Sequence, residues 1–158
     1  MTPDATPIRL LFVINPGAGN RRTNWPALIN AYFRGRPHQV SLFILPLQCS
    51  HEIIKNKIEE TAPHRIVAVG GDGTAKLVAE CILHSDILMA IIPAGSANGL
   101  ARELQIPTDP AEAIRGVLHN HFLSVHAVKI NNQYCFHLAD IGFNAFVVKK
   151  FESENVRG

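Results

Sequence analysis

The fold is decided by one stretch of the chain, Arg65-Ile66-Val67-Ala68-Val69-Gly70-Gly71-Asp72-Gly73-Thr74-Ala75. Its first five residues form an almost continuous apolar run, which is typical of a strand buried on both faces in a parallel sheet. The glycine-rich residues 70–74 break that strand. Apolar side chains then recur at helical spacing and predict a helix over residues 75–83. A strand joined to a helix by a short turn is the repeating unit of α/β proteins.

The same strand-then-helix pattern occurs on both sides of this stretch. Apolar runs predict further strands at residues 9–14, 40–45 and 88–92. Helices are predicted at residues 25–33, 51–60, 99–104 and 110–118, with Asn24, Ser50 and either Thr108 or Asp109 as N-caps. This order predicts an α/β fold, an open parallel sheet flanked by helices on both faces.

The pattern changes near residue 121. Two strand-like runs, 122–130 and 134–139, are joined by Asn131-Asn132-Gln133 and predict an antiparallel hairpin, followed by a helix through residue 151. We therefore expect an α/β domain over residues 1–120 and the start of a β-rich second domain over residues 121–158. A two-stranded hairpin is marginal unless its apolar face is covered, so we expect self-association through residues 122–140.

Composition excludes several classes of protein. Of the 158 residues 47% are hydrophobic and 18% charged, which is ordinary for a folded globular chain. A net charge of +2 without a basic run argues against nucleic-acid binding. The three cysteines are far apart and predict free thiols in a reducing cytosol. The N-terminus lacks a signal-peptide pattern and no apolar run approaches the ~20 residues of a membrane span, so we expect a cytoplasmic protein with peripheral membrane contact at most.

Three predicted strands end in unusual turns: residues 15–19 (Asn-Pro-Gly-Ala-Gly), 70–74 (Gly-Gly-Asp-Gly-Thr) and 93–98 (Pro-Ala-Gly-Ser-Ala-Asn). Such strand ends share one edge of a parallel sheet, where open α/β sheets bind ligands. Glycines allow close backbone approach, and helix N-termini attract anions. Together they predict a phosphate cradle, which Arg21 and Arg22 could reach. Taken singly, each turn could be a structural connection, and neither a Rossmann fingerprint nor a Walker loop is present.

Other residues have competing interpretations. Asp72, an acid among amides, fits a site where Mg²⁺ or a substrate hydroxyl lies beside phosphate. His119, His121, His126 and His137 suggest a metal site, but without a convincing ligand set we predict none. Ser96 lacks the surroundings of a catalytic nucleophile, so a hydrogen bond to a nucleotide is preferred. Trp25 is assigned to helix packing rather than to stacking on adenine, and Cys81 is assigned to the hydrophobic core.

The three turns, in this order, resemble the motifs of the diacylglycerol kinase and sphingosine kinase family of lipid kinases. Gly-Gly-Asp-Gly-Thr is also shared with NAD kinases and loosely with phosphofructokinases, whereas residues 15–19 and 93–102 resemble the lipid-kinase branch. The resemblance implies an ATP- and Mg²⁺-dependent enzyme that transfers the γ-phosphoryl group to a diacylglycerol- or sphingoid-like lipid hydroxyl at the membrane surface. An NAD kinase-like enzyme and a non-catalytic nucleotide-binding module remain the alternatives.

Site residues follow from the resemblance one by one. Those implied to contact ATP are Asn15, Pro16, Gly17, Ala18 and Gly19 in the first turn, Gly70, Gly71, Asp72, Gly73 and Thr74 in the second, and Ser96 in the third. Asp72 is implied to be catalytic, at the phosphate and metal end, and Asn98 to hold the third loop or touch the phosphates. Departures from the family pattern are Lys76 and Leu77 for Asn-Glu, Gly99 for Asp, Pro46 for Thr, and His126 and Asn144 for Asp. Family members continue into a longer β-rich domain carrying the lipid site, so we expect this chain to be truncated.

Overall fold

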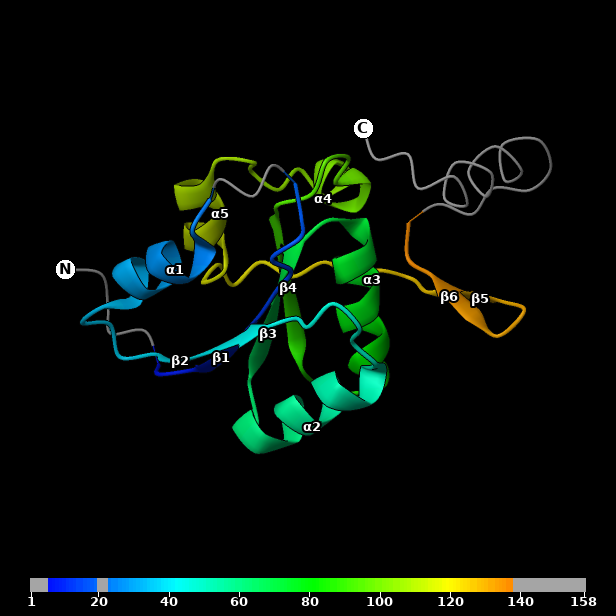
Figure 1. Ribbon diagram of the computed structural model, residues 1–158, viewed down its shortest axis with the longest axis horizontal. Helices are drawn as coiled ribbons and strands as arrows, with labels where there is room; N and C mark the ends of the chain where they lie inside the picture. Colours follow the sequence, from blue (N-terminus) through cyan, green and yellow to red (C-terminus); the bar gives the residue numbers. More distant parts are fainter. Residues whose placement is uncertain (1–5, 20–22, 138–158) are drawn as a thin grey trace. The chain divides into compact units, whose positions relative to one another are not determined.

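The computed structural model describes residues 6–19 and 23–137. These residues belong to two compact units, Met1–Ser124 and Val125–Gly158, which are described separately. The first unit alternates strands and helices (Figure 1). Its elements are β1 (Arg9–Ile14), α1 (Trp25–Phe33), β2 (Gln39–Ile44), α2 (His51–Thr61), β3 (Arg65–Gly70), α3 (Asp72–Cys81), β4 (Leu88–Pro93), α4 (Gly99–Glu103) and α5 (Pro110–Gly116).

The sheet of the first unit has four strands in the order β2-β1-β3-β4, and every neighbouring pair is parallel. In the centre, Phe12 lies opposite Leu42 of β2 on one side and Val67 of β3 on the other. The predicted open parallel α/β sheet is therefore confirmed. The chain passes from β1 outward to β2 and then returns to the opposite side of β1. This reversal makes the carboxyl ends of β1 and β3 the switch point, where such sheets bind ligands.

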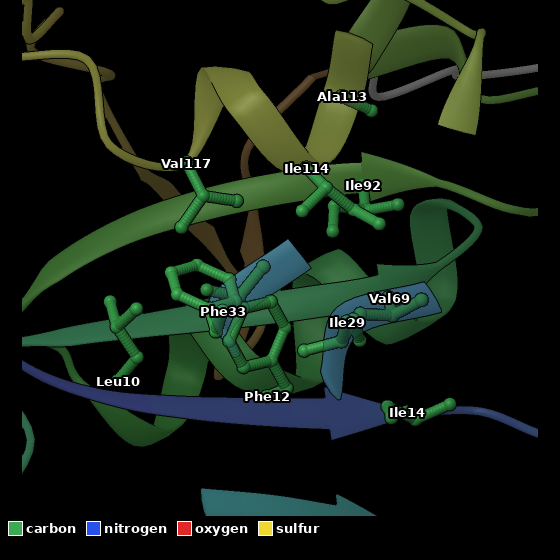
Figure 2. Close-up of a cluster of buried hydrophobic side chains, with 11 residues drawn as sticks. Leu10, Phe12, Ile14, Ile29, Phe33, Val69, Ile92, Ala113, Ile114 and Val117 are labelled. Atoms are coloured by element: carbon green, nitrogen blue, oxygen red, sulfur yellow. The ribbon is translucent and has the colours of Figure 1, made fainter. Parts of the chain in front are cut away.

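Strand β1 supplies side chains to two separate hydrophobic cores. Leu10, Phe12 and Ile14 point to one face, where α1 and α5 cover them with side chains that include Ile29 and Ile114 (Figure 2). The alternate residues of β1 point to the other face, which α2 and α3 cover (Figure 1). Alternation along a strand places successive side chains on opposite faces. Burial of both faces explains why β1 reads as a continuous apolar run.

The helix signals of the sequence have mixed outcomes. The Asn24 side chain accepts a hydrogen bond from the Ala27 amide at 3.1 Å, and Asp109 caps α5 through the Glu112 amide at 3.0 Å. Ser50 occupies the predicted N-cap position of α2, but its side chain makes no capping bond. Trp25 is partly buried against the core that α1 covers, as expected for helix packing.

Helix α3 begins earlier than the sequence predicts. It starts at Asp72 rather than Ala75, so three of the five residues of the expected turn form the first turn of a helix. Gly71 is the N-cap in an extended conformation, and its carbonyl accepts the Ala75 amide at 3.0 Å. The earlier start of α3 affects the site, because the backbone amides of the first helical turn have no acceptor within the helix.

Arg65 is a buried cation at the start of β3, the edge of the sheet opposite the three glycine-rich turns. Its relative exposure is 5%, and its guanidinium donates to the carbonyl oxygens of Val117 and His119 just after α5. Burial lowers the pKa of Arg65. A cation at a helix C-terminus is stabilised by the carbonyls there, and the chain leaving α5 is thereby fixed to β3.

Partly buried thiols adjoin the second core. Cys49 and Cys81 pack against the side chains between the sheet and helices α2 and α3, as predicted for Cys81. The Cys81 thiol donates to the carbonyl oxygen of His51 at 3.7 Å. Burial raises the pKa of Cys81 to about 11, because a thiolate is poorly stabilised among apolar side chains.

The described part of the second unit is a short antiparallel hairpin, β5 (Val128–Ile130) and β6 (Gln133–Cys135). Ile130 pairs with Gln133, so the turn consists of Asn131 and Asn132 alone, with φ of 48° and 65°. The predicted antiparallel hairpin is confirmed, but its turn has two residues rather than three and its first strand begins at Val128 rather than at residue 122. Residues 138 and 139 of the predicted second strand lie outside the described residues. Asparagine tolerates the left-handed conformation that a two-residue hairpin turn requires. The helix predicted through residue 151 and Asn144 lie outside the described residues.

Candidate functional site

The three glycine-rich turns meet where β1, β3 and β4 end. The Asn15 amide donates to the Val69 carbonyl at 2.9 Å, and the Ala94 amide donates to the Gly70 carbonyl at 2.9 Å. These bonds extend the parallel ladders by one residue into the turns. The first, second and third loops, defined as residues 15–19, 70–74 and 93–98, therefore lie side by side at the switch point of the sheet.

Asn15 ties the first loop to the second. Its Nδ2 donates to Oγ1 of Thr74 at 3.1 Å, and its Oδ1 accepts the Gly17 amide at 2.9 Å. Thr74 is buried, with a relative exposure of 5%. Both polar ends of the Asn15 side chain are thus used within the protein, one for the shape of its own loop and one for the contact with α3.

Three glycines are required by close contacts at these loops. A Cβ built on Gly95 would lie 2.5 Å from Cα of Gly71 and 2.9 Å from Oδ1 of Asn98. A Cβ on Gly70 would overlap the Thr74 side chain. Gly19 has a φ of 59°, and a Cβ there would overlap the Ala94 carbonyl oxygen. Contacts within the protein therefore account for these glycines, without any ligand.

Asn98 holds the third loop in shape. Its residue is in the left-handed conformation with a φ of 51°. Its Oδ1 accepts the Gly95 amide at 2.9 Å and its Nδ2 donates to the Gly95 carbonyl at 2.7 Å. The side chain is buried, so these bonds are shielded from water. Of the two roles expected for Asn98, the structure contains the loop-holding one.

Asp72 bridges the second loop to the helix that follows the third. Its Oδ2 accepts the Gly99 amide and its Oδ1 accepts the Leu100 amide, each at 3.0 Å. The sequence does not predict either hydrogen bond, because Asp72 and Gly99 are 27 positions apart and become neighbours only through the pairing of β3 with β4. Asp72 also lies in the first turn of α3, where a negative charge is favoured by the helix dipole.

Gly73 differs from the other glycines of the site. It is exposed, it lies in the first turn of α3, and a Cβ built on it would meet no atom within 4 Å. Among the described residues, no side chain caps the N-terminus of α3. The first turn of a ten-residue helix therefore carries an exposed glycine with open space on its side-chain side, an arrangement suited to an anion that approaches the backbone closely.

The remaining predicted site residues line the same edge. Pro16, Gly17 and Ser96 are exposed and Ala18 is half-buried. Arg21 and Arg22 lie outside the described residues. Within residues 6–19 and 23–137, no three His, Cys, Asp or Glu side chains are placed to hold a metal ion. None of the helices in those same ranges is long and apolar enough to cross a membrane.

The fold and this site define a member of a known class. Residues 9–130 match the family model of the diacylglycerol kinase catalytic domain, which covers all three loops. This chain therefore belongs to the diacylglycerol kinase catalytic domain family.

Individual relatives agree with that assignment. A Stenotrophomonas maltophilia protein named "Probable lipid kinase YegS-like" is 38% identical over 92 residues, 52% of this chain and 30% of the relative. A diacylglycerol kinase of Staphylococcus saprophyticus is 36% identical over 76 residues, 47% of this chain and 25% of the relative. A crystal structure of a diacylglycerol kinase from Bacillus anthracis matches with a TM-score of 0.67 and 25% identity, covering 82% of this chain and 46% of that one. The chain thus spans less than half the length of each of these relatives.

Proposed function

We propose that the three loops bind Mg-ATP and that the chain is the nucleotide-binding part of an ATP-dependent lipid kinase. The observation that carries the proposal is Gly73. Its neighbours Gly70, Gly71 and Gly95 are explained by contacts within the protein, whereas Gly73 has open space where a side chain would be. A glycine that the fold does not require, at the uncapped end of α3, is accounted for by a phosphate oxygen that approaches the helix amides.

The residues present fit a magnesium–nucleotide complex. The first-turn amides of α3 would hold the phosphates, with residues 15–19 and Ser96 on either side. Mg²⁺ is held in many phosphoryl-transfer sites by one or two carboxylates together with the phosphates, and Asp72 supplies one carboxylate at this place. ATP supplies the transferable phosphoryl group, and Mg²⁺ neutralises its negative charge. The catalytic role of Asp72 is then to act at the phosphate and metal end.

The names of the relatives support a lipid as the acceptor. They are called lipid kinase and diacylglycerol kinase, and the matched family model carries the same activity in its description. We therefore propose a lipid hydroxyl of the diacylglycerol or sphingoid type, presented at a membrane surface, as the group that is phosphorylated.

A second function, nucleotide binding without turnover, is favoured for the 158-residue chain by itself. This chain covers only 46% of the Bacillus anthracis kinase that it resembles in structure. The described residues contain the three loops but show no second carboxylate bonded to them. Binding of Mg-ATP without phosphorylation of a lipid is the result that would distinguish this second function from the kinase.

Calorimetry and a lipid phosphorylation assay test these proposals. The chain should bind Mg-ATP, and Gly73→Val should abolish binding at the phosphate end while the protein stays folded. Turnover of diacylglycerol is then compared between this chain and a longer one extended by a relative's sequence. No heat of ATP binding in the folded chain would contradict the nucleotide site, whereas binding without turnover in the longer chain would contradict only the kinase.

Self-association is proposed through apolar side chains of the hairpin in the second unit. Val128 and Ile130 are 56% and 43% exposed, and among the described residues β5 pairs with β6 alone, so β5 can accept a strand of another chain. Exposed edges with apolar side chains favour pairing between chains. Light scattering of the chain at several concentrations tests this directly.

A further inference from the structure

Helix α4 lacks the cap that its own sequence offers. Asn98, at the N-cap position, belongs to a residue type that commonly accepts the first amides of a helix. Here its side chain is bonded to the backbone of Gly95 instead and makes no capping bond. The amides of Gly99 and Leu100 would have no acceptor if Asp72 did not supply one.

We propose that Asp72 is a positioning residue that closes the site by capping α4 from a neighbouring helix. Each of its oxygens accepts one amide at 3.0 Å, a two-pronged bond between α3 and α4. Hydrogen bonds with a charged partner are about twice as strong as neutral ones. Asp72 directly follows Gly71, which lies against Gly95 of the third loop. The two hydrogen bonds to α4 therefore fix the third loop against the second. This inference deepens the proposed nucleotide site, and only its ATP affinity measurement rests on that proposal.

Removal of Asp72 should change the affinity for metal-free ATP in opposite ways, depending on whether Asp72 positions the loop or acts only through Mg²⁺. If Asp72 acts only by holding Mg²⁺, its removal leaves the affinity for metal-free ATP unchanged, or raises it by removing a negative charge. If Asp72 fixes the third loop, its removal weakens the binding of metal-free ATP as well as that of Mg-ATP. The two forms of the nucleotide therefore separate the two roles.

Amide hydrogen exchange tests the cap without any ligand. In the full chain, Asp72→Ala should speed exchange at Gly99 and Leu100 at least about fivefold, the usual consequence of losing a cap. Exchange at Phe12 in the central strand should stay unchanged. A matched control is Asp109→Ala, which removes the cap of α5 and should speed exchange at Glu112 only.

Asp72→Asn keeps one acceptor oxygen, so it should leave one of the two amides protected from exchange. This variant replaces Asp72→Ala in the test if the alanine variant does not fold. Titration with ATP in EDTA and with Mg-ATP should show a loss of affinity for Asp72→Ala in both conditions. Unchanged exchange at Gly99 and Leu100, or unchanged or tighter binding of metal-free ATP, would overturn the inference. If the wild-type chain binds no ATP, the proposed function fails, while the exchange result still decides whether Asp72 positions the loop.

Discussion

Replacing Gly73 by alanine separates stability from nucleotide binding. A methyl group at this position meets no atom within 4 Å, so it costs nothing in packing. Alanine is a better helix former than glycine, and the change should raise the free energy of unfolding by up to about 1 kcal/mol. The same methyl group lies where phosphate would approach the amides of α3. A phosphate oxygen must come within about 2.9 Å of an amide nitrogen, and a carbon atom needs about 3.5 Å.

The expected loss of affinity follows from the bonds that the methyl group prevents. One hydrogen bond to a charged group contributes about 1.5–3 kcal/mol, so losing one should weaken Mg-ATP binding about 10- to 150-fold. Gly116→Ala is the matched control, because Gly116 also lies in a helix and has no atom within 4 Å of a built Cβ. Calorimetry with Mg-ATP and thermal unfolding should show two stabilised variants, of which only Gly73→Ala binds poorly. Equal ATP affinity in Gly73→Ala and wild type would refute the reasoning.

Three further outcomes are expected. Asn15→Ala removes two hydrogen bonds within the site and should lower the free energy of unfolding by about 1–3 kcal/mol in urea titrations, a loss that Asn15→Asp should partly spare. Because folding raises the pKa of Cys81 to about 11, the protonated thiol stabilises the fold below the pKa of the unfolded chain. That stability should fall between about pH 9 and pH 11 in wild type and not in Cys81→Ala, as measured by unfolding at several pH values. Replacing Val128 and Ile130 together by threonine should lower the apparent mass of the chain in light scattering; an unchanged mass would count against association through the hairpin.

Strands β1 and β3 could be predicted from the sequence because each is buried on both faces. Leu10 and Leu11 face different cores, and no polar residue interrupts the run that contains them. The three loops could also be placed, since the ends of parallel strands must share an edge. The caps Asn24 and Asp109 act within a few residues, so local sequence was sufficient for them.

What could not be predicted depends on contacts between distant segments. Helix α3 begins at Asp72, directly after Gly71 packs on Gly95, whereas a sequence of glycines, an acid and a hydroxyl is typical of a turn. The cap that Asp72 provides for α4 has no local signal for the same reason. Arg65 likewise reads as the polar end of a strand, although the carbonyls beyond α5 enclose it.

The first strand of the chain is also a central strand of its sheet. Strand β1 pairs with β2 on one side and with β3 on the other, and it supplies both hydrophobic cores. On the ribosome, β1 therefore emerges before either neighbour exists; β2 can cover one edge once residue 44 is made, but the edge that pairs with β3 stays open until synthesis has passed Gly70. Chains are made at about 5–20 residues per second, so a nascent chain carries an incompletely paired apolar strand for several seconds. Assembly of this sheet thus begins at a central strand and is completed only after β3 and β4 have been made.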